Sequence, residues 1–277
     1  MKNILLANIG LKAVFIFISG FISTKGVGQC GIIASDDTVV CVSKPVIQLT
    51  ASSSGALGYT WTPATGLNNV GISNPIARPT VTTSYIVTSV VPDNVELVIN
   101  GDFESGNTGF TTSYTYKSNP VPGSNNLSEG QYTVKANPAQ THQCFTACSD
   151  KTTGTGNQMI FNGSRFANVA VWTQTITVQP NTDYAFSAWL QNVTCPPYGF
   201  NAELQFSVNG NLLGNIFKSD SAVCKWKQFY QIWNSGSSTS ATISIVNQYT
   251  SLDGNDFALD DISFKKFCNA KDTVTII

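Results

Sequence analysis

The chain has 277 residues, enough for one large domain or two of ordinary size. Hydrophobic residues make up 42% of it, but charged residues only 11%, less than half of the roughly 25% usual in globular proteins. The formal net charge of −1 offers no basic field for nucleic acid, and a single histidine excludes most His-rich metal sites. Low charge with abundant Ser, Thr and Asn predicts a secreted, all-β protein.

The first 29 residues have the pattern of a signal peptide. Lys2 and Lys12 precede an apolar stretch at 13–22, and small or polar residues follow at 23–29. The stretch is short for a membrane span, which needs about 20 apolar residues. We therefore predict cleavage near Gln29 and a secreted or cell-surface location, with an uncleaved anchor as the alternative. No other segment is apolar and long enough, so no transmembrane segment is expected after cleavage.

Alternating polar and apolar residues predict many short β-strands. The segments 184–190 and 202–208 alternate cleanly, and 173–178 and 241–246 are rich in β-branched residues. Asn209-Gly210 follows the second segment and predicts a hairpin turn, because Asn and Gly accept positive φ at low cost. Strands at this spacing indicate a sandwich or jelly roll.

The sequence pattern changes near residue 93, and this change predicts two β domains. Residues 30–94 contain Val40 to Ala51, then Tyr59-Thr60-Trp61-Thr62-Pro63, and later Thr82 to Thr88. This pattern resembles the Ig-like, PKD-like repeats of bacterial surface proteins, and it implies a small sandwich with one buried Trp. Residues 95–266 are long enough to bury a core of their own.

The seven cysteines predict three disulfides and one unpaired residue in an oxidising compartment. Cys30, at the expected new N-terminus, is the natural unpaired one, and lipidation there is an alternative. In the PKD-like repeats an early Cys often pairs with one just before the last strand, but none lies between 88 and 94. The resemblance therefore implies a Cys41–Cys268 bridge, with 267–277 as the last strand and the large domain inserted. The alternative is that 267–277 is an unrelated tail or the start of another repeat.

The large domain opens with Leu97-Val98-Ile99-Asn100-Gly101-Asp102-Phe103-Glu104. It closes with Asn255-Asp256-Phe257-Ala258-Leu259-Asp260-Asp261-Ile262-Ser263-Phe264. These end motifs resemble those of galactose-binding-like jelly rolls, especially carbohydrate-binding modules of families four and nine. The resemblance implies the fold more firmly than a ligand, because this fold hosts many kinds of partner.

The same resemblance implies a structural Ca²⁺ site, because these domains pair their terminal strands. Glu104 and Asp261 would supply carboxylates, and carbonyl groups near Asn100 and Asp102 further oxygens, which suits calcium. The alternative is that Asp260 and Asp261 cap a bulge or turn. Asp253-Gly254-Asn255-Asp256 is a weaker calcium loop, for which a turn is the favoured interpretation.

A sugar site needs exposed aromatic platforms beside amide or carboxylate groups. Trp189 is the best platform, because it shares a strand face with Gln191 while Tyr184 and Leu190 face the other way. For every aromatic candidate, Trp189 included, a place in the core or at its rim is the alternative. The further candidates are Trp172 with Gln174 on its face, Asn247 at the end of a strand, and Tyr198 on a loop.

His142, Cys144 and Cys148 lie within seven residues and could begin a zinc site, but no fourth ligand is evident. Export favours oxidation, so we expect a Cys144–Cys148 disulfide with Cys195–Cys224 as the other pair. Crossed pairings stay open, because connectivity is not encoded locally.

Catalytic signatures are absent from the sequence: there is neither a Gly-x-Ser-x-Gly elbow nor a His-Glu-x-x-His motif. The sequence and its resemblances therefore predict an exported, non-catalytic carbohydrate-binding or adhesion protein of the bacterial cell surface, which binds glycan by aromatic stacking on its jelly roll. Its expected partners are a glycan or cell-surface polysaccharide, together with other surface proteins. The alternatives are a structural spacer or adhesin segment with no sugar site, and an accessory module of a glycan-degrading system.

Overall fold

The computed structural model describes residues 31–40, 45–195, 200–251 and 254–277. In these ranges the chain is built from strands, with one short 3₁₀ helix, η1 (Pro138–Gln140), so the predicted all-β class is confirmed. None of the helical structure in the same ranges has the length and hydropathy needed to cross a bilayer. The predicted signal peptide, Cys30, Cys41 and Tyr198 lie outside the described residues.

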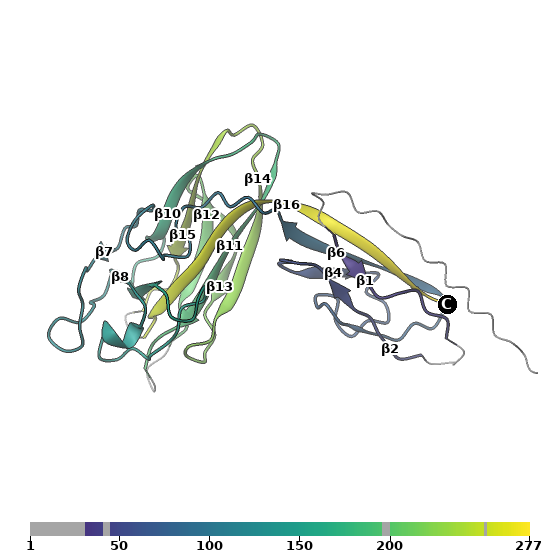
Figure 1. Cartoon of the computed structure of the whole chain (residues 1–277), viewed down its shortest axis with the longest axis horizontal. Coiled ribbons are helices and arrows are strands. Elements are labelled where there is room, and N and C mark those ends of the chain that lie inside the picture. The colour runs from purple at the N-terminus through teal and green to yellow at the C-terminus, as the bar shows by residue number, and fades with distance from the viewer. Residues whose placement is uncertain (1–30, 41–44, 196–199, 252–253) are drawn as a thin grey trace, which may run out of the picture.

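Residues 31–40 and 45–92, together with the end of the chain, form a small lobe (Figure 1). Its core surrounds the buried indole of Trp61, whose Nε1 donates to the Ile72 carbonyl at 2.9 Å. β4 pairs with β6, β2 with β5, and β1 with β3. The strands are β1 (Ile33–Ala34), β2 (Ile47–Gln48), β3 (Ala51–Ser52), β4 (Tyr59–Thr62), β5 (Ile76–Ala77) and β6 (Thr83–Pro92).

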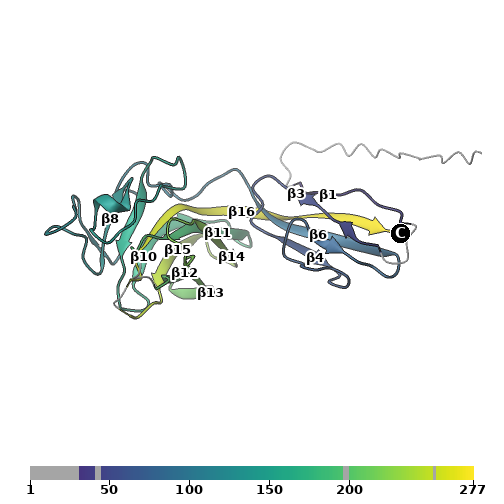
Figure 2. The same ribbon diagram turned by 90° about the horizontal axis from the view of Figure 1, so that it is seen from below.

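One long strand belongs to both lobes. β16 (Phe257–Ile276) pairs first with strands of the large lobe and then, from Phe267 onward, antiparallel with β6. Figure 2 shows its single ribbon passing from one lobe into the other. The last ten paired residues thus complete the sheet of the small lobe, and the large lobe lies in the connection between β6 and this half of β16.

The large lobe is a jelly-roll-like sandwich of two sheets. One sheet has the order β10-β15-β12-β13, and the other has the order β14-β11-β16-β9-β8-β7. Their facing sides enclose one core, which contains Tyr184, Phe186 and Leu190, as their alternation predicted. The strands are β7 (Thr115–Tyr116), β8 (Gln131–Lys135), β9 (Gln158–Asn162), β10 (Ala170–Thr177), β11 (Asp183–Asn192), β12 (Glu203–Val208), β13 (Asn211–Lys218), β14 (Lys227–Asn234) and β15 (Ser240–Asn247).

The predicted hairpin turn between β12 and β13 is confirmed. Asn209 and Gly210 have φ values of 51° and 78°, the left-handed conformation that the tight turn between two antiparallel strands requires.

A third layer covers part of the outer face of the larger sheet. Leu127, Phe145 and Cys148 pack there on Ile160, Val193 and Ala258, which point away from the main core. Two disulfides hold this layer, and they correct the expected pairing. Cys144 bonds to Cys195 and Cys148 to Cys224, so the Cys144–Cys148 and Cys195–Cys224 pairs are wrong.

The observed disulfide pairing follows from where the four cysteines lie in the folded chain. Cys144 and Cys148 lie on the covering segment, and each pairs with a cysteine on a strand connection of the sheet beneath it. The bonds therefore join layer to sheet rather than closing local loops. Cys268 is also disulfide-bonded, but Cys41 is outside the described residues, so their pairing stays a prediction.

Candidate binding site

A groove with a volume of about 550 Å³ lies where the two lobes meet. The small lobe contributes the turn around Ser54 and Gly55 and the end of β6. The large lobe contributes its first turn and the middle of β11 and β16. Its lining includes Asp93, Glu96, Asn100, Asp102, Trp189 and Asp261.

Trp189 is the aromatic residue of this groove. It lies on β11, half-buried, while its neighbours Ala188 and Leu190 are fully buried in the core. The pairing of β11 with β16 shifts register here: Ser187 lies opposite Ser263, but Trp189 lies opposite Asp260. The resulting bulge at Asp261 opens the sheet surface beside the indole ring.

The first turn of the large lobe packs directly on this bulge. The Ile262 amide donates to the Gly101 carbonyl at 2.9 Å, and a Cβ on Gly101 would collide with the Ile262 carbonyl oxygen. Only glycine permits this approach. The contact places Asn100 and Asp102 beside Asp261 along the groove, so the opening and closing motifs of the domain do meet in space.

The Asn100 side chain organises the turn. Its Nδ2 donates to the carbonyl groups of Gly106 and Thr108, at 2.9 and 2.8 Å, and its Oδ1 accepts from the Ser105 amide at 2.9 Å. Its φ of 55° is one that Asn tolerates better than most residues. A local network of this kind fixes the backbone on one side of the groove.

The groove is acidic. Carboxylates of Asp93, Glu96, Asp102 and Asp261 line it, together with the ammonium of Lys265, which lies 3.6 Å from Glu96 Oε2. Glu96 is held in place, because its Oε1 accepts from the Phe264 amide at 2.8 Å and its Oε2 from Ser263 Oγ at 2.6 Å. A surface of this charge disfavours anionic ligands and suits neutral hydroxyl groups.

Asp260 supports the groove from beneath. Its carboxylate is fully buried and accepts from the backbone amides of Lys151 and Asp261, at 2.7 and 2.8 Å. Burial raises the pKa of this carboxyl from 3.8 to about 7, which these hydrogen bonds and that of Thr152 only partly oppose. The side chain ties the 150–157 loop to β16.

The two carboxylates predicted to bind calcium, Glu104 and Asp261, both accept hydrogen bonds from the 150–157 loop. Glu104 Oε1 accepts from the Asn157 amide at 3.1 Å, and Asp261 Oδ1 from Thr152 Oγ1 at 2.7 Å. Among the described residues, no three His, Cys, Asp or Glu side chains are grouped as metal ligands. A bound Ca²⁺ would therefore need carbonyl oxygens beside these two carboxylates. The donor set, oxygen atoms only, fits calcium chemistry.

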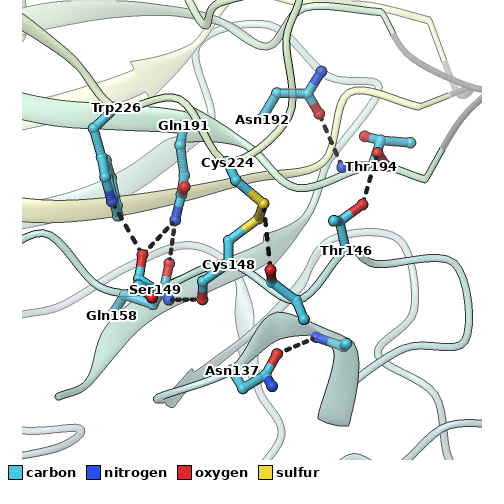
Figure 3. Close-up of a disulfide and its surroundings, with 12 residues drawn as sticks. Asn137, Thr146, Cys148, Ser149, Gln158, Gln191, Asn192, Thr194, Cys224 and Trp226 are labelled. Atoms are coloured by element: carbon cyan, nitrogen blue, oxygen red, sulfur yellow. Dashed lines mark hydrogen bonds between the residues drawn. A yellow bond between two sulfur atoms is a disulfide. The ribbon is translucent and has the colours of Figure 1, made fainter. Parts of the chain in front are cut away.

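Gln191 does not line the groove with Trp189, although the two residues lie two positions apart on β11. Its side chain is fully buried under the third layer, where Nε2 donates to Gln158 Oε1 at 2.6 Å and to the Ser149 carbonyl at 3.2 Å. Figure 3 shows Gln191 pointing toward Ser149 beside the Cys148–Cys224 disulfide. The prediction that it borders a sugar platform is wrong, because the disulfide-held segment covers this part of the strand face.

Three other predicted ligand-binding residues are structural. Trp172 is fully buried in the core, 6.4 Å from Phe186 between ring centroids. Gln174 accepts from the Ile99 amide at 2.9 Å and donates to the Ile99 carbonyl at 3.0 Å. Asn247 is fully buried and donates to the Ser164 and Phe166 carbonyls, at 2.8 Å each. Tyr198 lies outside the described residues.

Two residues at the groove escaped sequence reasoning. Lys151 places its Nζ 4.3 Å from the centroid of the Trp189 ring, and Ser263 anchors Glu96. Lys151 belongs to no recognisable motif, and Ser263 lies in the closing motif of the large domain, which assigns it no binding role. Exposed aromatic rings also lie outside the groove: Phe166 is 58% exposed, and Phe200 is 54% exposed and stacks on Tyr249.

Comparisons with known proteins give likenesses of fold. No family model matches the chain, and no curated protein matches it. A family 16 carbohydrate-binding module is 15% identical, with a TM-score of 0.35, over 61% of this chain and 98% of that one. The CBM22-1 xylan-binding domain of Paenibacillus barcinonensis Xyn10C is 13% identical, with a TM-score of 0.37, over 62% and 92%.

An arabinose-bound α-L-arabinofuranosidase, MgGH51, is 16% identical, with a TM-score of 0.41, over 62% of this chain and 26% of that one. Similarity at this level does not bear on which ligand the chain binds. The chain is an all-β protein in which a jelly-roll-like lobe adjoins a small β lobe at an acidic groove.

Proposed function

We propose that this protein is an exported, non-catalytic carbohydrate-binding protein that holds a glycan in the groove between its lobes. The observation that carries the proposal is the position of Trp189. It is a half-exposed indole in a groove whose other walls present carboxylate, amide and hydroxyl groups. A sugar offers an apolar ring face to an aromatic platform and hydroxyl groups to polar neighbours.

The charge of the groove selects among glycans. Its lining holds four carboxylates and the ammonium of Lys265, and Lys151 adds a second ammonium over the Trp189 ring. Carboxylates accept hydrogen bonds from sugar hydroxyls but repel sulfates and uronates. The proposed substrate class is therefore a neutral glycan, such as a neutral polysaccharide at a cell surface.

A structural spacer is the rival function. Trp172, which would have extended the platform, is fully buried, and among the described residues no second aromatic side chain lines the groove beside Trp189. A single platform supports weak binding of a short sugar stretch more readily than tight binding of a long one. The same test separates the two functions, because a spacer has no specific glycan.

Ca²⁺ is part of the proposal as a structural ion. Glu104 and Asp261 would hold it together with carbonyl oxygens of the first turn and the 150–157 loop. The ion would join the opening turn to the bulge beside Trp189. Removing it should then weaken glycan binding without changing the residues that contact the sugar.

The test is a glycan-array screen of the oxidised protein, run with Ca²⁺ and again with chelator. We expect a neutral glycan hit that Trp189→Ala abolishes. The matched control is Phe166→Ala, which removes an exposed aromatic ring that lines a different pocket and should leave the hit unchanged. A folded protein with no hit, or a hit indifferent to Trp189→Ala, would refute the groove as a sugar site and favour the spacer.

A further inference from the structure

A second pocket of the large lobe contains a tryptophan that the groove does not use. The pocket has a volume of about 370 Å³ and lies between the β12–β13 hairpin of one sheet and the end of β14 in the other. β13 and β14 are the last strands of their sheets and are not hydrogen-bonded to each other. The seam between the two sheets is therefore open here, and Trp233 lines it.

Trp233 is held firmly in this seam. Its ring centroid lies 6.1 Å from those of Tyr184 and Phe264 in the core. The side chain is nevertheless only half-buried, whereas Trp172 is fully buried. None of the cation–π contacts among the described residues involves Trp233. Unlike Trp189, it therefore carries no ammonium that a ligand would have to displace.

Polar groups with free hydrogen-bonding capacity surround the indole. Asn209 Oδ1 accepts from the Thr242 amide at 2.8 Å, which fixes the side chain and leaves its Nδ2 without a partner among the described residues. The side-chain oxygen of Asn211 and the hydroxyls of Ser237 and Ser238 also make no hydrogen bond to a described residue. Amides and hydroxyls both donate and accept, so they match a ligand that is rich in hydroxyl groups.

The walls of the pocket are fixed by hydrogen bonds within the chain. Ser235 Oγ donates to the Gln179 carbonyl at 2.6 Å and accepts from the Thr182 amide at 2.9 Å. Asn234 Oδ1 accepts from the Gly236 amide at 2.9 Å. A pocket whose walls are already ordered loses little conformational freedom when a ligand binds.

The charge of this pocket differs from that of the groove. Among the described residues that line it, none has a charged side chain. Amides, hydroxyls and one indole suit an uncharged ligand that combines a flat apolar face with many hydroxyl groups, which is the chemistry of a neutral sugar. The volume is near the lower end of the roughly 300–1,000 Å³ of small-ligand pockets, which suits one sugar residue rather than a chain.

We propose that this pocket is a second carbohydrate site, which binds one neutral sugar residue on Trp233. Asn209, Asn211 and the hydroxyls at 237–238 supply its hydrogen bonds. The site does not rest on the groove, because Gln228, which lines the groove, lies about 16 Å from Trp233 along β14. The two side chains also point to opposite faces of the strand.

The test is saturation-transfer NMR of the oxidised protein with free glucose, galactose, mannose and xylose. It is run on the Trp189→Ala variant, in which the groove has lost its platform. At least one of these sugars should receive saturation transfer in this background. Adding Trp233→Leu, which keeps an apolar contact with the core, should lower the affinity for that sugar at least tenfold.

A second variant leaves the core untouched. Asn211 is exposed on β13, so Asn211→Ala should weaken binding several-fold without a loss of stability. The matched control is Asn215→Ala, which removes an exposed asparagine of the same strand outside the pocket and should bind as the background does.

The site is refuted if none of the sugars receives transfer from the folded Trp189→Ala protein, or if Trp233→Leu and Asn211→Ala both leave the transfer unchanged. Transfer that Trp189→Ala abolishes and Trp233→Leu preserves would assign the sugar to the groove and overturn this site alone. Transfer that survives Trp189→Ala and is lost in Trp233→Leu would support this site, whatever the glycan array shows for the groove.

Discussion

The ammonium of Lys151 lies over the indole ring of Trp189, with Nζ 4.3 Å from the ring centroid. Lys151 is placed there by its own backbone, because its amide donates to the buried Asp260 carboxylate at 2.7 Å. One ring face at the groove thus carries a cation, and a sugar stacking on that face must displace it.

Lys151→Met should strengthen binding of a neutral glycan. An exposed cation–π contact is worth about 0.5–1 kcal/mol, so its removal should raise the affinity about two- to fivefold. Met keeps the apolar stem, and the backbone bond to Asp260 is unaffected. Titration of the array hit by calorimetry measures the change. A weaker affinity would mean that the ammonium contacts the sugar or that the opposite ring face is used.

Gly101→Ala should destabilise the large lobe. The added Cβ meets the Ile262 carbonyl oxygen, which belongs to backbone and cannot rotate away. Overpacking of this kind costs about 1–3 kcal/mol in the free energy of unfolding. Urea denaturation measures it, with Gly71→Ala as control, because that Cβ would meet only the Asn69 side chain at 3.6 Å. Equal stability of the two variants would contradict the close approach.

Peptide mapping should find Cys148 cross-linked to Cys224 and Cys144 to Cys195. The double variant Cys148→Ser, Cys224→Ser should lose about 2–4 kcal/mol of stability, as expected for a bond that closes a long loop. Gln191 should become accessible to solvent, because the layer above it is released. Hydrogen exchange of the strand around Gln191 reports this exposure. A peptide joining Cys144 to Cys148 would overturn the layer arrangement.

His142 should make the protein less stable in acid. Burial lowers the pKa of its imidazole below the usual 6.5, and its Nδ1 accepts from the Cys144 amide at 3.1 Å. The folded state therefore binds the proton less readily than the unfolded state. The free energy of unfolding that the neutral imidazole contributes is fully present above pH 6.5. It is lost as the pH falls below 6.5 toward the lowered pKa of the folded state.

The chain has one histidine, so a single imidazole resonance follows the titration by NMR. Denaturation at pH 8 and pH 5 should show a smaller acid loss in His142→Gln than in wild type. An NMR pKa at or above 6.5 would show that burial does not govern this side chain.

Much of the architecture could be predicted from short segments of the sequence. Alternation located the core-facing residues of β11, and Asn209-Gly210 located the hairpin, because both depend on residues adjacent in sequence. The resemblance of the end motifs to those of jelly-roll domains also implied that Asn100 and Asp102 would approach Asp261. Strand identity and turn chemistry are properties that short segments specify.

Trp189 and Gln191 show what the sequence by itself could not decide. Both belong to the polar face of one strand, and alternation assigned them a common environment. In the folded chain Trp189 borders an open groove, while Gln191 is sealed beneath a segment more than thirty residues earlier in sequence. The strand pattern determined which way each side chain points. Only the tertiary structure decided what covers it, because that depends on disulfide pairing and layer packing between segments far apart along the chain.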